Sequence, residues 1–390
     1  MSARTLNPDL GFVKDVISSG GESLKKCYQC ATCSVVCNMT PDANPFPRKE
    51  MIQAQWGLKE QLFGNPDIWL CHQCSDCTAY CPRGAKPGEV LNAIRKMSIR
   101  RYSKPGFLAK MAGDPKSLIV LLAIPVVILL AILGSLGHLT SISNIPRGED
   151  GSIVYAKWIP VPFIDATFGT AAAFALAVFI MGVRSYWKDL SSGLTPQQIA
   201  AKGGPFQNLA PVLSDILAHR KFEKCETTKD RAQAHKFVFY AFVGLAITTT
   251  WAILYLYGYE LLGIKAFGPF HFGESPYPLT DPMKWLANVS ALALIAGILM
   301  VISNRIKNKE KAGGGSYYDW LFILVVAGVA FTGFFSEIFR LINAAPVAYP
   351  TYFTHLVLVF FLFAYAPFSK MAHMVYRGTA MVYGKLSGRA

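Results

Sequence analysis

The stretch CHQCSDCTAYCP, residues 71–82, decides the fold. Its four cysteines follow the spacing C-x2-C-x2-C-x3-C, which in water-soluble redox proteins binds a [4Fe–4S] cluster. Further along the chain, SLIVLLAIPVVILLAILGSLG at residues 117–137 is long and apolar enough to cross a bilayer. Together the two stretches predict a soluble redox head joined directly to a membrane part.

The same cysteine spacing occurs earlier, in CYQCATCSVVC at residues 27–37. Three cysteines separated by two residues each can bind three corners of one cubane, and in two-cluster ferredoxins the fourth completes the other cluster. Pro82 follows the second motif and Asn38 the first, but a proline is not a ligand. The expected ligand sets are Cys27, Cys30, Cys33 and Cys81 for one cluster and Cys71, Cys74, Cys77 and Cys37 for the other.

Structural zinc is the alternative for these cysteines, but zinc sites usually join two Cys or Cys/His pairs across a longer loop. Disulfides are not expected, because the polar start of the chain lacks the apolar segment of a secretory signal and predicts a head in the reducing cytoplasm. Two further residues are noted here. His72 is expected to be an exposed histidine, with tuning of the second cluster as the alternative, and Cys225 an incidental thiol.

The membrane part is expected to contain six spans. The chain is 52% hydrophobic with a mean hydropathy of +0.32, and a span needs roughly 17 to 25 mostly apolar residues. The predicted spans are residues 117–137, 166–187, 236–258, 284–303, 319–339 and 352–373.

Lys and Arg are concentrated in alternate connections between these spans, which the positive-inside rule assigns to the cytoplasm. Both termini are then cytoplasmic, and the net charge of +14 needs no nucleic acid as a partner. The chain is therefore expected to be mainly α. A small α-helical ferredoxin-like domain over residues 1–110, with helices at 47–63 and after the second motif, precedes a six-helix cytochrome b membrane domain over residues 111–390.

Two histidines of the last span suggest haem. His355 and His373 are eighteen residues apart, which in one continuous helix places both imidazoles on the same face, roughly 27 Å apart along the axis. That distance is close to the thickness of the hydrocarbon layer. The pattern predicts a nitrogen ligand near each membrane surface, as two b-type haems require, whereas two interfacial histidines are the plainer alternative.

Each haem needs a second ligand at the same depth. On the inner side, His235 at the start of span three is the preferred partner of His373, with His219 in reserve. On the outer side, His138 at the end of span one is preferred over His271 as the partner of His355, because a helix end is held better than a loop.

Other polar residues near the membrane are candidates for quinone or haem chemistry. Glu337 and Arg340, one turn apart in span five, could move protons at a quinone site or form an ordinary interfacial ion pair. Lys370 could neutralise a haem propionate or extend to the membrane surface. The segment RKFEKC, with Arg220, Phe222 and Cys225, could dock the head or be a plain amphipathic helix.

These residues resemble known families. The cysteine region, ending in CPRGAKPGEVLNAIRK, is similar to the C subunit of heterodisulfide reductase, and HRKFEKC with AHKFVFYAFVGL and the last-span histidines resembles its cytochrome b subunit and the gamma subunit of respiratory nitrate reductase. The combination in one chain resembles the QmoC family, the membrane subunit of the quinone-interacting membrane-bound oxidoreductase complex of sulfate reducers.

The resemblance implies an electron-transfer subunit that carries two [4Fe–4S] clusters and haem b and reacts with menaquinone. It also implies QmoA-like and QmoB-like flavoprotein and iron–sulfur partners, which link the membrane quinone pool to adenylylsulfate reductase. The nitrate-reductase-like pattern has a second histidine ten residues after the position of His235, where this chain has Leu245. The resemblance therefore carries over the inner haem onto His235 and His373, but leaves His355 without its expected partner. Either His138 or His271 takes that place, or the outer site binds no haem, so one or two haems are expected.

Two other functions are compatible with the sequence. A proton or ion transporter could use Glu337 and the histidines with the head as a redox sensor, although no inverted repeat is apparent. A passive anchor would hold no haem. No G-x-G-x-x-G or P-loop motif occurs, so flavin and nucleotides are expected on partner subunits.

Overall fold

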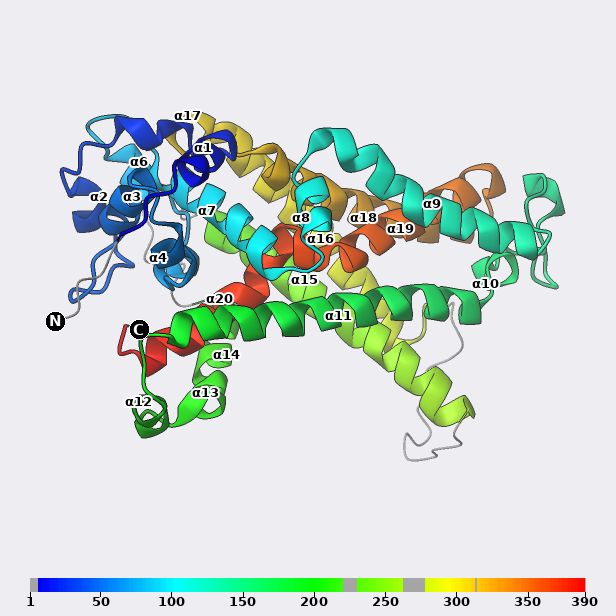
Figure 1. Cartoon of the computed structure of the whole chain (residues 1–390). Helices are drawn as coiled ribbons and strands as arrows, with labels where there is room; N and C mark the ends of the chain where they lie inside the picture. Colours follow the sequence, from blue (N-terminus) through cyan, green and yellow to red (C-terminus); the bar gives the residue numbers. More distant parts are fainter. Residues whose placement is uncertain (1–5, 220–229, 262–277, 313, 390) are drawn as a thin grey trace.

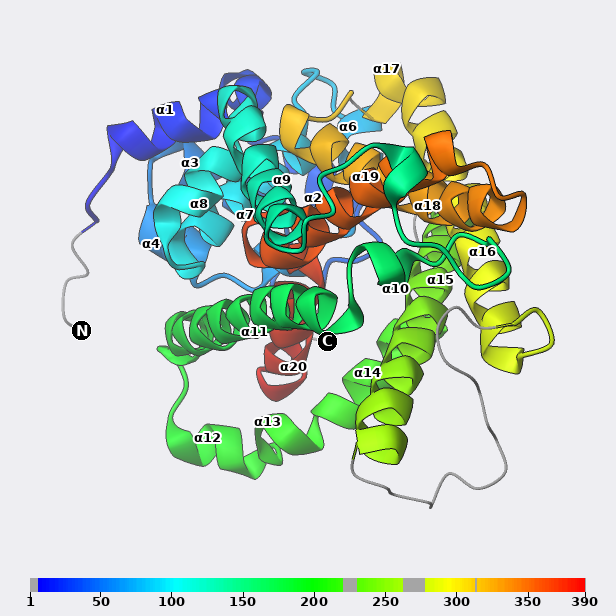
Figure 2. The same cartoon turned by 90° about the vertical axis from the view of Figure 1, so that its right-hand side faces the viewer.

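A computed structural model describes residues 6–219, 230–261, 278–312 and 314–389. Every regular element in these ranges is a helix, which confirms the expected mainly α class. Figure 1 shows the cysteine-bearing head at one end of an elongated bundle, and Figure 2 looks toward the other end. In the following, the head end and the far end denote these two ends.

The head is built from short helices around one longer helix, α7. The sequence predicted one helix over 47–63, but the structure has two, α3 and α4, separated at Gly57. Gly57 has φ +68°, and a Cβ there would lie 2.5 Å from the Asp9 carbonyl oxygen, so the chain turns where only glycine fits. The head helices are α1 (Leu10–Ser18), α2 (Thr32–Val35), α3 (Arg48–Gln55), α4 (Lys59–Phe63), α5 (Asp67–Leu70), α6 (Asp76–Ala79), α7 (Pro87–Tyr102) and α8 (Gly106–Ala112).

Six helices of the described chain are long and apolar enough to cross a membrane, as predicted. α15 packs against α16, α16 against α18, and α18 against α19, while α9 and α11 contact α19 from the other side. The span helices are α9 (Leu118–Ser135), α11 (Val161–Ser191), α15 (Asp230–Ile253), α16 (Pro282–Lys307), α18 (Tyr317–Leu341) and α19 (Ala345–Ala364); α15 continues as a π-helix over Leu254–Leu261.

The shorter helices of the membrane part lie at its two ends. α10 (Tyr155–Trp158) belongs to the far end. Three helices at the head end, α12 (Pro196–Ala201), α13 (Gly204–Gln207) and α14 (Leu209–Ala218), connect α11 to the segment before α15.

The last predicted span, 352–373, is wrong in its second half. α19 ends at Ala364, two 3₁₀ turns follow, and a separate helix α20 (His373–Leu386) packs against α5 of the head. Pro367 lies in this break, and a proline can neither donate a helical hydrogen bond nor continue the helix without a clash. His355 and His373 therefore do not share one face of a single straight helix.

Buried aromatic rings join the head to the bundle. Tyr376 of α20 lies between Trp69 of the head (ring centroids 5.3 Å apart), Tyr102 of α7 (5.9 Å) and Tyr186 of α11 (5.7 Å). All four rings are almost completely buried. A Cβ at Gly182 would lie 2.4 Å from the Tyr376 hydroxyl oxygen, so α11 can approach α20 only with glycine at this position. The hydrophobic core is thus continuous from the head into the membrane part.

Replacing Tyr376 by Ala should lower the free energy of unfolding by about 3–5 kcal/mol, because the buried ring would leave a cavity between head and bundle. The measurement is the denaturation midpoint of the full chain in detergent. Tyr376→Phe is the matched control, since it removes only a hydroxyl 3.3 Å from the Ser103 hydroxyl and should cost about 1 kcal/mol. Equal losses in both variants would contradict this account of the junction.

Candidate electron-transfer site

The first predicted cysteine set surrounds one small cavity in the head. Cys27, Cys30, Cys33 and Cys81 all line it, although Cys81 comes from the second motif. Cys30 is exposed and Cys33 is buried. Burial raises the pKa of the Cys33 thiol to about 11. A buried thiolate needs a cationic partner, which iron supplies when it binds.

The second predicted set also combines cysteines from both motifs. Cys37, from the first motif, interacts electrostatically with Cys71 and Cys74, and Cys77 interacts with all three. Burial raises the pKa of the Cys37 thiol to about 12. In both places the structure thus brings three cysteines of one motif together with the fourth of the other.

Both motifs fold into the same unusual loop. The residues on either side of the second cysteine are left-handed in each: Gln29 (φ 61°) and Ala31 (69°), and Gln73 (52°) and Ser75 (70°). Non-glycine residues in this conformation are strained and cluster at functional loops. The Gln73 N–H donates to the Cys71 sulfur at 3.3 Å. These turns have no local signal in the sequence, because none of the four positions is a glycine.

In the described ranges, no group of three or more His, Cys, Asp or Glu side chains is placed to hold a single metal ion. The eight cysteines, each set with three from one motif and one from the other, fit the donor pattern of two-cluster ferredoxins.

A large cavity of about 1090 Å³ runs from the second motif into the bundle. This volume is at the upper limit of ordinary cofactor pockets. α7, α14 and α20 enclose its head end, and α15, α16, α18 and α19 line it within the bundle. His72, His219, His235, His355 and His373 all line this cavity.

His235 and His373 are neighbours at the head end of the cavity. The His373 Nδ1 lies 2.7 Å from the Lys370 carbonyl oxygen; because a carbonyl only accepts, Nδ1 carries the proton and Nε2 is the basic nitrogen. Iron-binding histidines usually have such a backbone partner.

His219 links His235 to the backbone through two hydrogen bonds. Its Nδ1 lies 3.0 Å from the Leu217 carbonyl oxygen, and its Nε2 lies 3.1 Å from the His235 Nδ1. With the His219 proton on Nδ1, its Nε2 accepts from His235, and the basic nitrogen of His235 is again Nε2. His219 therefore orients His235, whereas the sequence offered it only as an alternative ligand.

His355 lies deeper in the bundle, against α18. Its Nδ1 is 3.1 Å from the Thr332 hydroxyl. A Cβ at Gly333 would lie 2.8 Å from the His355 ring, so the imidazole occupies space that only glycine leaves. Leu245 lines the same cavity and brings no second imidazole to it.

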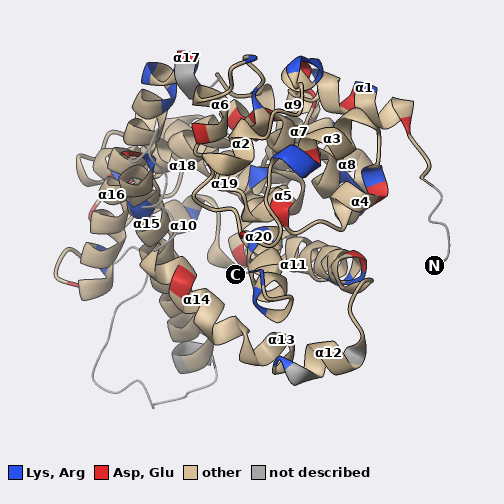
Figure 3. Ribbon diagram, turned by 90° about the vertical axis from the view of Figure 1, so that its left-hand side faces the viewer, with Lys and Arg blue, Asp and Glu red and all other residues tan. Residues whose placement is uncertain are grey.

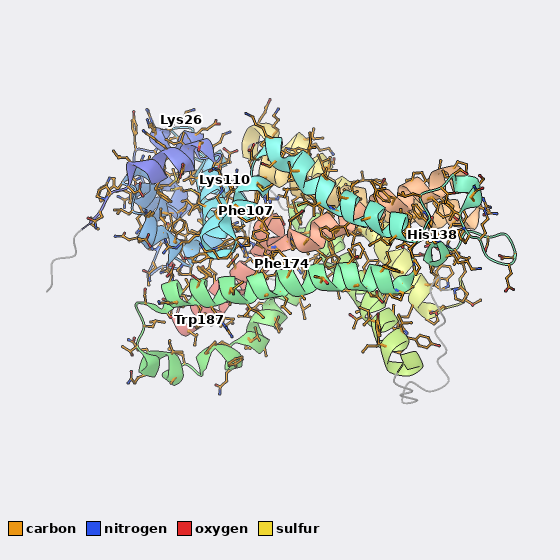
Figure 4. The ribbon with its side chains drawn as sticks, turned by 45° about the vertical axis from the view of Figure 1, so that its right-hand side comes forward. Lys26, Phe107, Lys110, His138, Phe174 and Trp187 are labelled. Carbon is orange, nitrogen blue, oxygen red and sulfur yellow. The ribbon has the colours of Figure 1, made fainter. Side chains whose placement is uncertain are left out.

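His138, the preferred second haem ligand opposite His355, does not lie near His355. His138 lies at the far end of the molecule (Figure 4), where its Nδ1 donates to the Trp158 carbonyl at 2.5 Å, and it does not line the large cavity. The alternative, His271, lies outside the described residues, as do Arg220, Phe222 and Cys225.

The predicted Glu337–Arg340 pair does not form. The Glu337 carboxylate pairs instead with Lys284 of α16 at 2.8 Å, and the Asn288 side chain donates to it at 3.3 Å. Lys284 is the first residue of the predicted fourth span, and only helix packing places it beside Glu337. Glu337 and Asn288 both line the cavity at its deeper end.

Lys370 is paired with a carboxylate that sequence reasoning missed. Its ammonium contacts the buried Asp319 of α18, which also accepts from the Asn92 side chain of α7 at 3.1 Å and lies 3.9 Å from Arg305. Figure 3 shows Lys and Arg around this end of the molecule. The only signal in the sequence was an ionisable residue at the edge of a predicted span.

The cysteine region matches proteins of known type. A family profile described as a 4Fe-4S dicluster domain matches residues 23–85. The C subunit of the H(2):CoB-CoM heterodisulfide,ferredoxin reductase of Methanothermobacter marburgensis is 33% identical over 104 residues, 26% of this chain and 54% of that protein. The C2 subunit of the H(2)/formate:CoB-CoM heterodisulfide,ferredoxin reductase of Methanococcus maripaludis is 36% identical over 109 residues, 26% of this chain and 58% of that protein.

A longer but weaker similarity also includes the membrane part. Citrate utilization protein B of Escherichia coli is 24% identical over 382 residues, 92% of this chain and 89% of that protein. No solved structure matches the chain. The chain spans little more than half the length of the heterodisulfide reductase subunits that it matches. Its N-terminal part is a 4Fe-4S dicluster domain similar to the C subunit of heterodisulfide reductase, a component of redox enzymes.

Proposed function

We propose that this protein is the electron-transfer membrane subunit of a quinone-linked oxidoreductase complex. Electrons pass between menaquinone, one haem b, two [4Fe–4S] clusters and a soluble flavoprotein partner. The observation that carries the proposal is the cavity itself, which has His72 of the second motif and the neighbouring His235 and His373 in its walls. The cavity between the membrane helices is thus lined both by histidines and by part of the cysteine-bearing head.

The residues at the head end of the cavity fit haem b. His235 and His373 would ligate its iron through Nε2, held by His219 and the Lys370 carbonyl respectively. Basic side chains near these imidazoles, among them Arg231 and Arg377, would neutralise its propionates. A haem supplies one-electron chemistry when bound, and the protein sets its ligation, burial and hydrogen bonding.

The deeper end of the cavity fits a quinone better than a second haem. Among the described residues no other imidazole faces His355, whereas Asn288 and Glu337 provide polar groups in otherwise apolar walls. A pocket of mainly apolar side chains with a few polar groups is typical of small-molecule sites. We therefore propose His355 as a hydrogen-bond partner of the quinone and Glu337 as the group that exchanges its protons.

Partners and pathway belong to the same proposal. The resemblance to the QmoC family favours QmoA-like and QmoB-like partners, a cytoplasmic head and a role in dissimilatory sulfate reduction through adenylylsulfate reductase. The similarity to a citrate utilization protein favours a partner involved in the use of citrate. The membrane subunit would be the same in both cases, because the substrate would be bound by the soluble partner.

His373→Ala and His235→Ala should each abolish the b-type absorption of the purified chain, because each removes one axial nitrogen. Pyridine haemochrome analysis should find about one haem per wild-type chain. His138→Ala is the matched control and should retain the haem, as should His219→Ala, although its low-spin signal should broaden. A colourless wild-type membrane part, or haem loss in His219→Ala but not in His235→Ala, would contradict this assignment.

Glu337→Gln should slow reduction of the haem by a menaquinol analogue by about 100-fold, because a general base contributes roughly that factor or more. The measurement is stopped-flow absorption at constant haem content. Arg340→Gln is the control and should react like wild type, since Glu337 pairs with Lys284 instead. Equal slowing in both variants would remove Glu337 from the proton path.

A further inference from the structure

Two arginines from different helices hold the loop that carries the second cysteine motif. Arg95 of α7 and Arg377 of α20 both donate to the Cys71 carbonyl, the latter at 3.1 Å. Each also donates to a carbonyl just before the loop, at 2.6 Å and 3.4 Å, and Arg377 contacts the His72 Nε2 as well. Both guanidinium groups thus lie on the backbone of Cys71, one of the expected ligands of the second cluster.

A third arginine comes from the membrane part. Arg231, at the start of α15, donates to the Gln73 carbonyl. In the first loop, Arg48 donates to the Gln29 carbonyl at 3.1 Å, and Arg48 is exposed. The Leu24 and Cys27 carbonyls, at the positions of Ile68 and Cys71, accept from the uncharged Gln55 side chain at 3.0 Å and 2.9 Å. The two loops have the same backbone shape, but the second carries two additional guanidinium groups.

The two loops also face different surroundings. His72, Gln73 and Ser75 of the second loop line the large cavity. In the first loop, Cys30 is exposed and Tyr28 is 68% exposed. The second cysteine set therefore lies against the membrane cavity, and the first set lies toward the solution, where a soluble partner can reach it.

These charges act on the cluster in a predictable direction. Every thiolate ligand is negative, and reduction adds a further negative charge. A nearby guanidinium stabilises the reduced state more than the oxidised one, and so raises the reduction potential. Partial burial strengthens this effect for Arg95 and Arg377, whereas water screens the charge of Arg48.

We propose that the second cluster is the one that exchanges electrons with the cavity, and that Arg377 is the positioning residue that holds its ligand loop at the cavity and raises its reduction potential above that of the first cluster. The step moves one electron between the occupant of the cavity and the cluster, so that one is oxidised as the other is reduced, and no atom is transferred. The proposal rests on the proposed function, because the occupant of the cavity is the haem or quinone proposed there.

The test is a redox titration of the full chain, followed by EPR, with dithionite and mediators. The wild type should show two cluster midpoints. Arg377→Gln should move the higher midpoint to more negative potential and leave the lower one in place, whereas Arg377→Lys should largely restore it. Arg48→Gln, at the first-loop carbonyl equivalent to the one that Arg231 contacts in the second loop, should leave the higher midpoint unchanged.

If Arg377→Gln does not retain both clusters, Arg231→Gln provides the same test and should lower the same midpoint by a smaller amount. A shift of the lower midpoint in either variant, or no shift, would overturn the proposal. The titration needs neither quinone nor haem, so this result is independent of the haem and quinol assays. A chain without haem would refute the proposed function and still give a clear answer on Arg377.

Discussion

The break in the chain between α19 and α20 is the constraint on which the rest of this structure depends. α19 runs toward the head (Figure 1), and the turn over Ala366–Phe368 already contacts α7 and α8. The break then lets α20 pack against α5 of the head and against α11 and α14. Other helices satisfy the backbone groups that the break exposes: the Ser103 hydroxyl donates to the Pro367 carbonyl at 2.6 Å, and the Tyr318 hydroxyl to the Phe368 carbonyl at 2.9 Å. An unpaired carbonyl buried here would cost about 1–3 kcal/mol.

Three residues of α20 contact three different parts of the molecule: the cavity, the junction between head and bundle, and the second cysteine loop. His373 is its first residue and lines the cavity, Tyr376 packs between head and bundle, and Arg377 reaches the second cysteine loop. Near the end of the chain, Arg389 pairs with the buried Asp67 of α5. These contacts join the head to the bundle through side chains rather than through the connection at α8 alone, so the distance between cluster and cavity is set by packing.

The charged groups around the cavity follow from the same arrangement. Buried charges are tolerated when they are paired and hydrogen-bonded. Asp319 meets this condition through Lys370, Ser316 and Asn92, and the arginines meet it through backbone carbonyls of the cysteine loop. The positive side chains at the head end of the cavity, Arg231, Arg377 and Lys370, are therefore paired within the protein.

Local patterns in the sequence determined much of this protein: the eight cysteines, the mainly α class, six apolar helices and the residues from which histidine ligands would come. These features depend on spacing along the chain and on hydropathy, which a sequence states directly. Only the tertiary structure separated His138 from His355, paired Glu337 with Lys284 and brought Arg231 and Arg377 to one loop. Such contacts join residues far apart in the chain, and they depend on where Pro367 ends a helix and on how closely glycines let helices approach, which no local pattern encodes.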